Sequence, residues 1–462
     1  MYTQSQIDPL VSFRNSQREA VRGTIINLQR KSLVMEVYNP YSIVQVSEVL
    51  DELTIHFGSS VAYRGRAVVV SLVNTGLTAI VSATLIDGWH ELDNIALVPG
   101  AVGEAATAFI EEWRKRFHIL PGYQLAVNEL RAFLADVSRW VEQVDLSESL
   151  PKEGGQLRRD VFDELVSPLI EQTNAYISRL EQEVRQVAEE LAPAHRSFAQ
   201  TALHPLLLRA PFVFRTYTKP LGYAGDYQMV IQMLDEPRKG PSTYFQMVNT
   251  AFLGNVLAQA HRNRIDILEA FLTRVADGAR KEGKPVRVLN VGCGPAIEIQ
   301  RFLRNYPKPE YVSFELVDFS EETLNWTRDK LSAIVAETGK SVIINYVHDS
   351  VHDLLKRRAD KSKRNPEFHA VYCAGLFDYL SDKVCTRLNG LFASRMHPGG
   401  TLLFTNVHAN NTTKFVMEHL LEWYLIYRDE GTLGPLIPAQ SSSRNVYVDA
   451  TGMNIFAEAV IE

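Results

Sequence analysis

The sequence predicts an α/β protein in which a small antiparallel β barrel (1–98) and a helical region (99–210) precede a Rossmann-like α/β domain (256–462). Short β-branched runs near the N-terminus, apolar residues at helical spacing in the middle, and alternating strands and helices in the C-terminal part predict this fold. An aromatic-rich segment at 211–255 precedes the last part. A chain of 462 residues is expected to form two or three domains.

The N-terminal part between 22 and 85 consists of short β-branched runs separated by turn residues. The turns are NPYS, GSS and NTG, and the runs are GTIINLQ, SLVMEVY, DELTIHF, AVVVSLV and TAIVSATL. Runs of this length and composition are typical of antiparallel strands. We therefore expect a small β domain here.

The middle of the chain changes to helical periodicity. We expect one helix at 124–144 and a long amphipathic helix at 157–191, kinked at Pro168 and ended by the APA sequence at 192–194. The next segment, 211–255, is dense in aromatic residues, Gly and Pro and has no clear period. It is predicted to be a structured loop that closes over a ligand.

The C-terminal part alternates apolar runs with helical patterns, as in a doubly wound parallel sheet. A helix at 414–427 and two final strands, NVYVD and IFAEAVI, follow. The five expected parallel strands are VRVLNV (286–291), YVSFELV (311–317), VIINYV (342–347), FHAVYCA (368–374) and TLLFTNV (401–407).

Composition excludes several classes of protein. The net charge of −6 gives no overall positive field for nucleic acid. Cys293, Cys373 and Cys385 are odd in number and contain no CxxC pair, which argues against a disulfide framework or a cysteine zinc site. No leader-like or membrane-spanning apolar run is seen, so we expect a cytoplasmic protein. No metal is expected, because a strand-to-helix transition separates His348 from His352.

The most informative motif is NVGCGPA at 290–296, a glycine turn between a buried strand and a helix. Gly292 and Gly294 let the backbone approach a ligand that a Cβ would block, and Pro295 favours a helix start with free N–H groups. A dinucleotide fingerprint needs a third glycine where this chain has Ile297. NAD and FAD are therefore disfavoured.

Two acids follow the next two strands: Asp318, 24 residues after Gly294, and Asp349. With AGLFDYL and HPGGTLLFTNV, this pattern resembles the class I S-adenosyl-L-methionine-dependent methyltransferases, although Asn290 replaces their usual acid and Ala296 their third glycine. The competing interpretation is an α/β domain without a cofactor. The resemblance implies S-adenosyl-L-methionine as cofactor, bound by Asn290, Gly292, Cys293, Gly294, Pro295, Asp318, Phe319, Asp349, Ser350 and Gly375.

A narrower resemblance rests on TKPLGYAGDYQMV (218–230), AGLFDYL, EWYLIYRDE and NVYVDATGMNIF. These segments are similar to bacterial proteins assigned to biosynthesis of a 3-hydroxypalmitic acid methyl ester extracellular factor. The resemblance implies methyl transfer to the carboxyl group of a hydrophobic or 3-hydroxy fatty acid. Two alternatives stay open: an O- or N-methyltransferase of another natural product, and a nucleotide-sensing regulatory protein with a methyltransferase-like binding module.

The catalytic candidates depend on the acceptor. A carboxylate is ionised at neutral pH and needs only orientation, whereas an alcohol or amine needs a general base. His408, just past the fifth strand, suits either role. Further candidates are Tyr223 and Asp226 in the lid-like loop and the two arginines Arg428 and Arg444, which can hold a carboxylate bidentately. The alternative for each residue is a capping or packing role.

The β domain resembles a PilZ domain, because Arg14 and Arg18 have the R-x-x-x-R spacing. The second PilZ signature is incomplete: Asn27 matches, but Gln29 replaces its Ser and Ser32 its Gly. We therefore expect the barrel to have a packing or dimerisation role and not to bind cyclic di-GMP tightly. For the whole protein, the expected partners are a small-molecule acceptor and a second copy of the chain in a homodimer.

Overall fold

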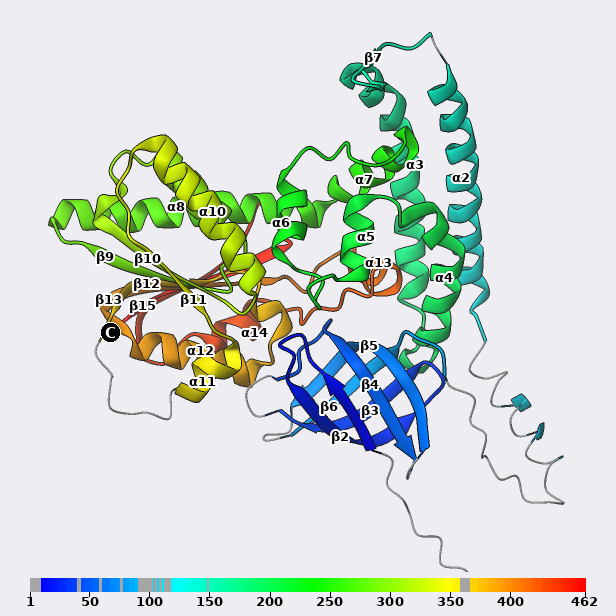
Figure 1. The fold of residues 1–462 in the computed structure, drawn as a ribbon, viewed down its shortest axis with the longest axis horizontal. Helices are drawn as coiled ribbons and strands as arrows, with labels where there is room; N and C mark the ends of the chain where they lie inside the picture. The colour runs from blue at the N-terminus through cyan, green and yellow to red at the C-terminus, as the bar shows by residue number, and fades with distance from the viewer. Residues whose placement is uncertain are drawn as a thin grey trace, which may run out of the picture.

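The computed structural model describes residues 10–39, 43–57, 60–74, 78–89, 118–147, 149–357 and 366–462, with a few positions between 103 and 111. A β barrel, a helical region and an α/β domain pack against one another (Figure 1). Three free cysteines, all buried, lie in the α/β domain. None of the helices described is long and apolar enough to cross a membrane.

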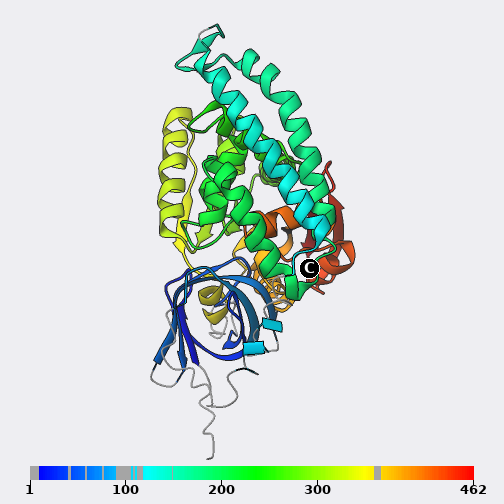
Figure 2. The same ribbon diagram turned by 90° about the vertical axis from the view of Figure 1, so that its right-hand side faces the viewer.

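The N-terminal part is a closed antiparallel barrel, as the sequence predicts. Its strands are hydrogen-bonded in the order β1-β2-β3-β6-β5-β4, and Figure 2 shows the barrel beneath the helices. Alternate residues of β3, Leu33, Met35 and Val37, are buried in the barrel core. The strands are β1 (Leu10–Arg14), β2 (Ala20–Leu28), β3 (Ser32–Tyr38), β4 (Val49–Phe57), β5 (Ser60–Asn74) and β6 (Thr78–Leu85).

The helical region differs from the prediction at the expected long helix. That helix ends at Val184, and the APA sequence begins the next helix instead of ending one, because Pro193 is accommodated in a first helical turn. The elements are α2 (Pro121–Leu146), a short hairpin of β7 (Lys152–Glu153) and β8 (Gln156–Leu157), α3 (Arg159–Val184), η1 (Glu189–Leu191) and α4 (Ala192–Leu207).

The segment 211–255 is helical, so the prediction of a loop was wrong for most of it. It forms α5 (Pro211–Thr218), α6 (Tyr227–Leu234) and α7 (Thr243–Leu253). Ten of the eleven residues of α7 are buried, so this helix has no solvent-exposed face and its sequence shows no clear amphipathic period. The connections at 219–226 and 235–242 remain irregular; the first, called the lid segment below, carries Tyr223.

The C-terminal domain has the predicted Rossmann-like architecture. Its sheet has the order β11-β10-β9-β12-β13-β15-β14. The strands from β11 to β13 are parallel, and β15 is antiparallel to both of its neighbours, β13 and β14. Its strands are β9 (Val286–Val291), β10 (Val312–Asp318), β11 (Ile344–His348), β12 (Phe368–Cys373), β13 (Met396–Val407), β14 (Ser441–Val448) and β15 (Asn454–Ile461).

Helices connect the strands and cover the sheet (Figure 1). The α-helices are α8 (Val256–Glu282), α9 (Ile297–Asn305), α10 (Glu321–Thr338), α11 (Val351–Arg357), α12 (Asp382–Ser394), α13 (Lys414–Leu420) and α14 (Glu430–Leu433). The short 3-10 turns are η2 (Pro309–Tyr311), η3 (Phe377–Tyr379) and η4 (Gly434–Leu436).

The helix expected at 414–427 is shorter than predicted, since α13 ends at Leu420. The chain then runs irregularly, and Glu422 has a left-handed φ of +49°. Alternate residues of this stretch lie against different neighbours: Trp423 lines a pocket in the α/β domain, whereas Tyr424 packs on the barrel. Packing on both sides favours extended chain here over an amphipathic helix.

Candidate functional site

A cavity of about 1010 Å³, including its mouth, lies at the carboxyl edge of the parallel strands. Its floor is the turn between β9 and α9. Gly292 and Gly294 have φ values of +69° and +50°, a left-handed conformation that glycine adopts without a steric penalty. The predicted glycine turn is therefore present and faces an open space.

Asp318 at the end of β10 holds this turn. Its carboxylate accepts hydrogen bonds from the backbone N–H of Gly294 (3.0 Å) and of Ser320 (3.0 Å). The side chain is buried, and burial raises the pKa of Asp318. Each carboxylate oxygen can accept more than one hydrogen bond, so Asp318 retains acceptor capacity toward a ligand in the cavity.

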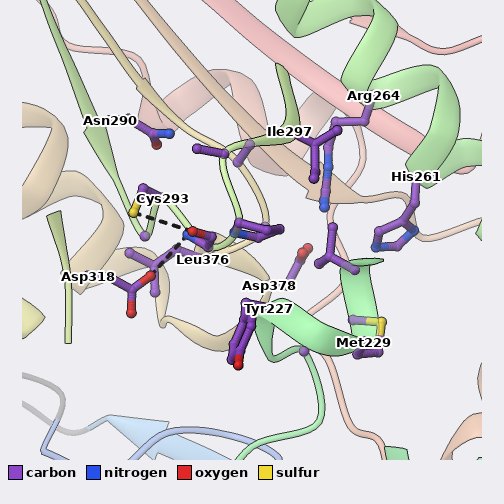
Figure 3. Close-up of a pocket in the computed structure, with 18 of the residues that line it drawn as sticks. Tyr227, Met229, His261, Arg264, Asn290, Cys293, Ile297, Asp318, Leu376 and Asp378 are labelled. Atoms are coloured by element: carbon purple, nitrogen blue, oxygen red, sulfur yellow. Dashed lines mark hydrogen bonds between the residues drawn. The ribbon is translucent and has the colours of Figure 1, made fainter. Parts of the chain in front are cut away.

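Arg264 reaches into the cavity from α8 (Figure 3). The residue is 6% exposed, and its guanidinium forms no hydrogen bond with any described residue. Gly375 makes room for it, because a Cβ there would lie 3.1 Å from the guanidinium. Asp378 and Glu298 are close enough to compensate part of its charge, but a buried guanidinium without hydrogen-bond partners is still costly, and arginine is well suited to bind a carboxylate. This side chain therefore indicates an anionic ligand.

Glu298, in the first turn of α9, brings a buried carboxylate to the same cavity. Its Oε1 accepts hydrogen bonds from Asn290 Nδ2 (3.2 Å) and from the Tyr372 hydroxyl (2.7 Å). Burial raises the pKa of Glu298. Asn290, which replaces the acid of the resembled family, thus holds an acid supplied by the following helix.

His261 and Asp378 are two further titratable groups close to Arg264 (Figure 3). The Nδ1–H of His261 donates to the Leu257 carbonyl (2.9 Å), which leaves Nε2 as an acceptor. Burial, together with the positive charge of Arg264, lowers the pKa of His261 to about 3. Asp378 accepts from the Val407 N–H (2.6 Å), and burial raises its pKa to about 6.

The sequence did not point to Arg264, His261, Glu298 or Asp378. His261 and Arg264 lie on the buried face of α8, three residues apart and in line with Leu268. Two polar residues at apolar positions of an amphipathic helix are the signal that was available. A similar signal was available for Glu298. The glycine-turn motif has Asn290 in place of the usual acid, and Glu298 is an acid in the helix that follows the turn.

Most of the expected cofactor residues line the cavity. They are Asn290, Gly292, Cys293, Gly294, Pro295, Asp318, Phe319 and Gly375. Asp349 and Ser350 lie beside it: the N–H of Asp349 donates to the carbonyl of Asp318 (3.2 Å), and the Ser350 hydroxyl donates to Asp353 (2.7 Å). Tyr223 also lines the cavity, with its ring centroid 5.2 Å from that of Phe319.

The other four catalytic candidates lie outside the cavity lining. Asp226 caps α6 and forms an ion pair with Arg215 (2.7 Å). His408 accepts from the Asn410 N–H (3.0 Å) at Nδ1 and faces Glu430 at Nε2 (3.4 Å). Asp226 and His408 therefore both interact with neighbouring protein groups in structural roles.

The two candidate arginines also have structural partners. Arg428 is 1% exposed and donates to Asp382, Asn406 and the carbonyls of Phe377 and Leu380. Arg444, on β14, donates to the carbonyls of residues 438 and 439. Neither arginine lines the cavity.

In the barrel, both arginines of the R-x-x-x-R spacing are exposed. Arg14 pairs with Glu52 (3.0 Å) and donates to the carbonyl of Arg18 (3.2 Å). The relation to PilZ domains stays a prediction. Among the described residues, no cluster of three or more His, Cys, Asp or Glu side chains has the arrangement of a metal site.

Comparison with known proteins bears on the α/β domain. Residues 230–422 match a family described as "Putative methyltransferase". The match supports a methyltransferase. No curated protein matches the chain in sequence.

Several solved structures are similar to the chain. A possible exported protein from Bordetella parapertussis is 15% identical over 65% of this chain and 96% of its own (TM-score 0.43). Magnesium protoporphyrin IX methyltransferase from Synechocystis, with bound S-adenosyl-L-homocysteine, is 12% identical over 45% and 88% (TM-score 0.34). The N-methyltransferase NodS from Bradyrhizobium japonicum is 12% identical over 44% and 87% (TM-score 0.29). Similarities this low carry no argument about the reaction.

Proposed function

We propose that this chain is an S-adenosyl-L-methionine-dependent methyltransferase acting on a small molecule. The observation that carries the proposal is the guanidinium of Arg264, which has no hydrogen-bond partner among the described residues and shares one cavity with the glycine turn and Asp318. S-adenosyl-L-methionine has a carboxylate, an ammonium group and two ribose hydroxyls, and when bound it supplies a methyl group on a sulfonium. The donors and acceptors of the cavity fit these groups.

Each end of the cofactor has candidate partners in this chain. Arg264 would bind the carboxylate and Glu298 the ammonium group, since both are buried and oppositely charged. Asp318 would accept from the ribose hydroxyls. Asp349 and Ser350, which follow the neighbouring strand, are kept as candidates for the adenine end.

The proposed acceptor is the carboxyl oxygen of a hydrophobic or 3-hydroxy fatty acid. Apolar side chains, among them Met229, Val407 and Leu425, line the cavity on the side of α6 and β13. A second, largely apolar cavity lies between α3, α7, α8 and α13, and Trp423 lines both cavities. An acceptor with a hydrocarbon chain would suit this environment, because it removes apolar surface from water.

The main task of the protein in such a transfer is to hold the nucleophile in line with the methyl group and to exclude water. A carboxylate nucleophile needs no base. The lid segment covers the cavity with Tyr223, whose hydroxyl forms no hydrogen bond with a described residue and is free to orient the acceptor.

The second candidate function is methylation of a hydroxyl or amine on another natural product. Asp378 favours it, because an acid with a pKa of about 6 is a suitable general base near neutral pH. Its charge would also repel a carboxylate acceptor. Turnover assays with 3-hydroxypalmitic acid and with hydroxyl and amine acceptors distinguish the two.

Calorimetric titration with S-adenosyl-L-homocysteine, the demethylated product, tests the shared core of both functions. We expect binding by the wild type and at least a tenfold loss of affinity in Asp318→Ala, which removes charge-assisted hydrogen bonds of about 1.5–3 kcal/mol each. Melting temperature checks that the variant is folded. Failure of the folded wild type to bind either the cofactor or its product would overturn the proposal and favour a binding module.

A further inference from the structure

The barrel touches the lid segment directly. The N–H of Val49, at the start of β4, donates to the carbonyl of Gly222 (2.8 Å), the residue before Tyr223. Ser16 lies against the same glycine: a Cβ at Gly222 would be 2.9 Å from the Cβ of Ser16. Gly222 also has a φ of +86°, so glycine is favoured here by both conformation and space.

One buried carboxylate organises the barrel residues that make this contact. Glu48 is 3% exposed and accepts from the Ser16 N–H (2.6 Å), the Ser16 hydroxyl (2.7 Å) and the Gln45 N–H (2.7 Å). It therefore joins the turn after β1 to the turn before β4. Gln45 itself lines the cavity of the α/β domain.

The barrel also supports a second wall of the cavity, the stretch 421–427. Trp423 and Leu425 line the cavity, whereas Tyr424 packs in a cluster with the barrel residues Val46, Val49 and Val68. The Ser47 hydroxyl donates to the carbonyl of Glu422 (3.3 Å). Two separate walls of the site thus rest on the same barrel segment, 45–49.

We infer that the barrel is a working part of the methyl-transfer site, in which segment 45–49 holds the lid segment and the stretch 421–427 in place and brings Gln45 to the cavity. Glu48 is the positioning residue of this contact. The inference rests on the proposed function for the identity of the ligand, but the contacts themselves do not depend on it. Glu48 acts on the lid segment through Ser16, which it binds and which lies against Gly222.

Hydrogen–deuterium exchange of the full chain tests the inference from both sides of the contact. Glu48→Gln removes an acceptor, because an amide nitrogen cannot accept a hydrogen bond. Gly222→Ala adds a methyl group against Ser16. In each variant we expect about tenfold faster exchange at 219–226 and 421–427, which is the effect of losing one hydrogen bond. We also expect S-adenosyl-L-homocysteine to dissociate about tenfold faster, as measured by tryptophan fluorescence.

Two matched substitutions control for charge and backbone strain. Glu52→Gln changes an exposed glutamate on the same barrel strand, and Gly339→Ala introduces alanine at a similar φ of +63° where a Cβ meets nothing within 4 Å. Both should leave lid exchange and ligand dissociation unchanged. If Glu48→Gln does not fold, exchange and ligand dissociation in Gly222→Ala, which alters the lid side of the contact, test the inference.

Faster exchange confined to the barrel strands, or unchanged exchange at 219–226 in the folded variants, would overturn the inference. Failure of the wild type to bind S-adenosyl-L-homocysteine is a separate result: it overturns the proposed function, and the exchange data alone then decide whether the barrel holds the lid.

Discussion

Arg264→Met should separate ligand binding from stability. Arg264 and Arg428 are both buried arginines, but only Arg428 has its N–H groups hydrogen-bonded within the protein. A residue that serves the fold loses stability when replaced, whereas one that serves a ligand loses affinity. The two arginines should therefore respond in opposite ways to the same substitution.

The magnitudes follow from these partners. Arg264→Met removes no hydrogen bond. It takes a positive charge from beside the buried acids Glu298 and Asp378 but also removes the cost of burying that charge, so the free energy of unfolding should stay within about 1 kcal/mol of wild type. Affinity for S-adenosyl-L-homocysteine should fall about a hundredfold, since two charge-assisted hydrogen bonds of about 1.5 kcal/mol each are lost. Arg428→Met leaves Asp382 and buried carbonyls without donors and should cost about 3–5 kcal/mol.

The assay combines denaturant unfolding with calorimetric titration of two ligands. 5′-Methylthioadenosine has the adenosine part of the cofactor but no amino-acid end. Its affinity should be the same in wild type and Arg264→Met, whereas the affinity for S-adenosyl-L-homocysteine should differ. Equal losses for the two ligands, or an unfolding cost of about 3 kcal/mol for Arg264→Met, would refute the reasoning and make Arg264 a structural residue.

Three further predictions concern the lid and the barrel. Tyr223→Phe should keep melting temperature and cofactor affinity but lose about tenfold in turnover on the true acceptor if its hydroxyl orients that acceptor; wild-type kinetics would exclude this role. Burial raises the pKa of Glu48 from 4.5 to about 7, so folding takes up a proton and the free energy of unfolding should fall as pH rises through this window. The fall is at most about 3 kcal/mol, and Glu48→Gln should flatten it in urea titrations at several pH values. Cyclic di-GMP should bind with a dissociation constant above about 1 μM; tighter binding lost in Arg14→Ala would contradict this and favour a sensor.

The sequence by itself determined the architecture of the α/β domain and the place of the cofactor turn. Strands such as β9 and β12 are mostly buried on both faces and therefore appear as short, largely apolar runs, which local pattern detects. The turn at Gly292 and Gly294 could also be predicted locally, because glycine adopts its left-handed conformation without a steric penalty. The antiparallel barrel was predicted for the same reason, from short β-branched runs and turns.

Only the tertiary structure decided which side chains share the cavity. Arg264 lies in the helix before the glycine turn, and its lack of a hydrogen-bond partner is visible only when its surroundings are known. His408, Arg428 and Arg444 had suitable chemistry, and His408 also had a strand-end position, but their hydrogen bonds are to structural partners outside the cavity. The contact between Val49 and Gly222 joins residues 173 positions apart by backbone groups alone, which leave no trace in residue type. Local periodicity specifies elements, whereas the pairing of distant groups depends on how those elements pack.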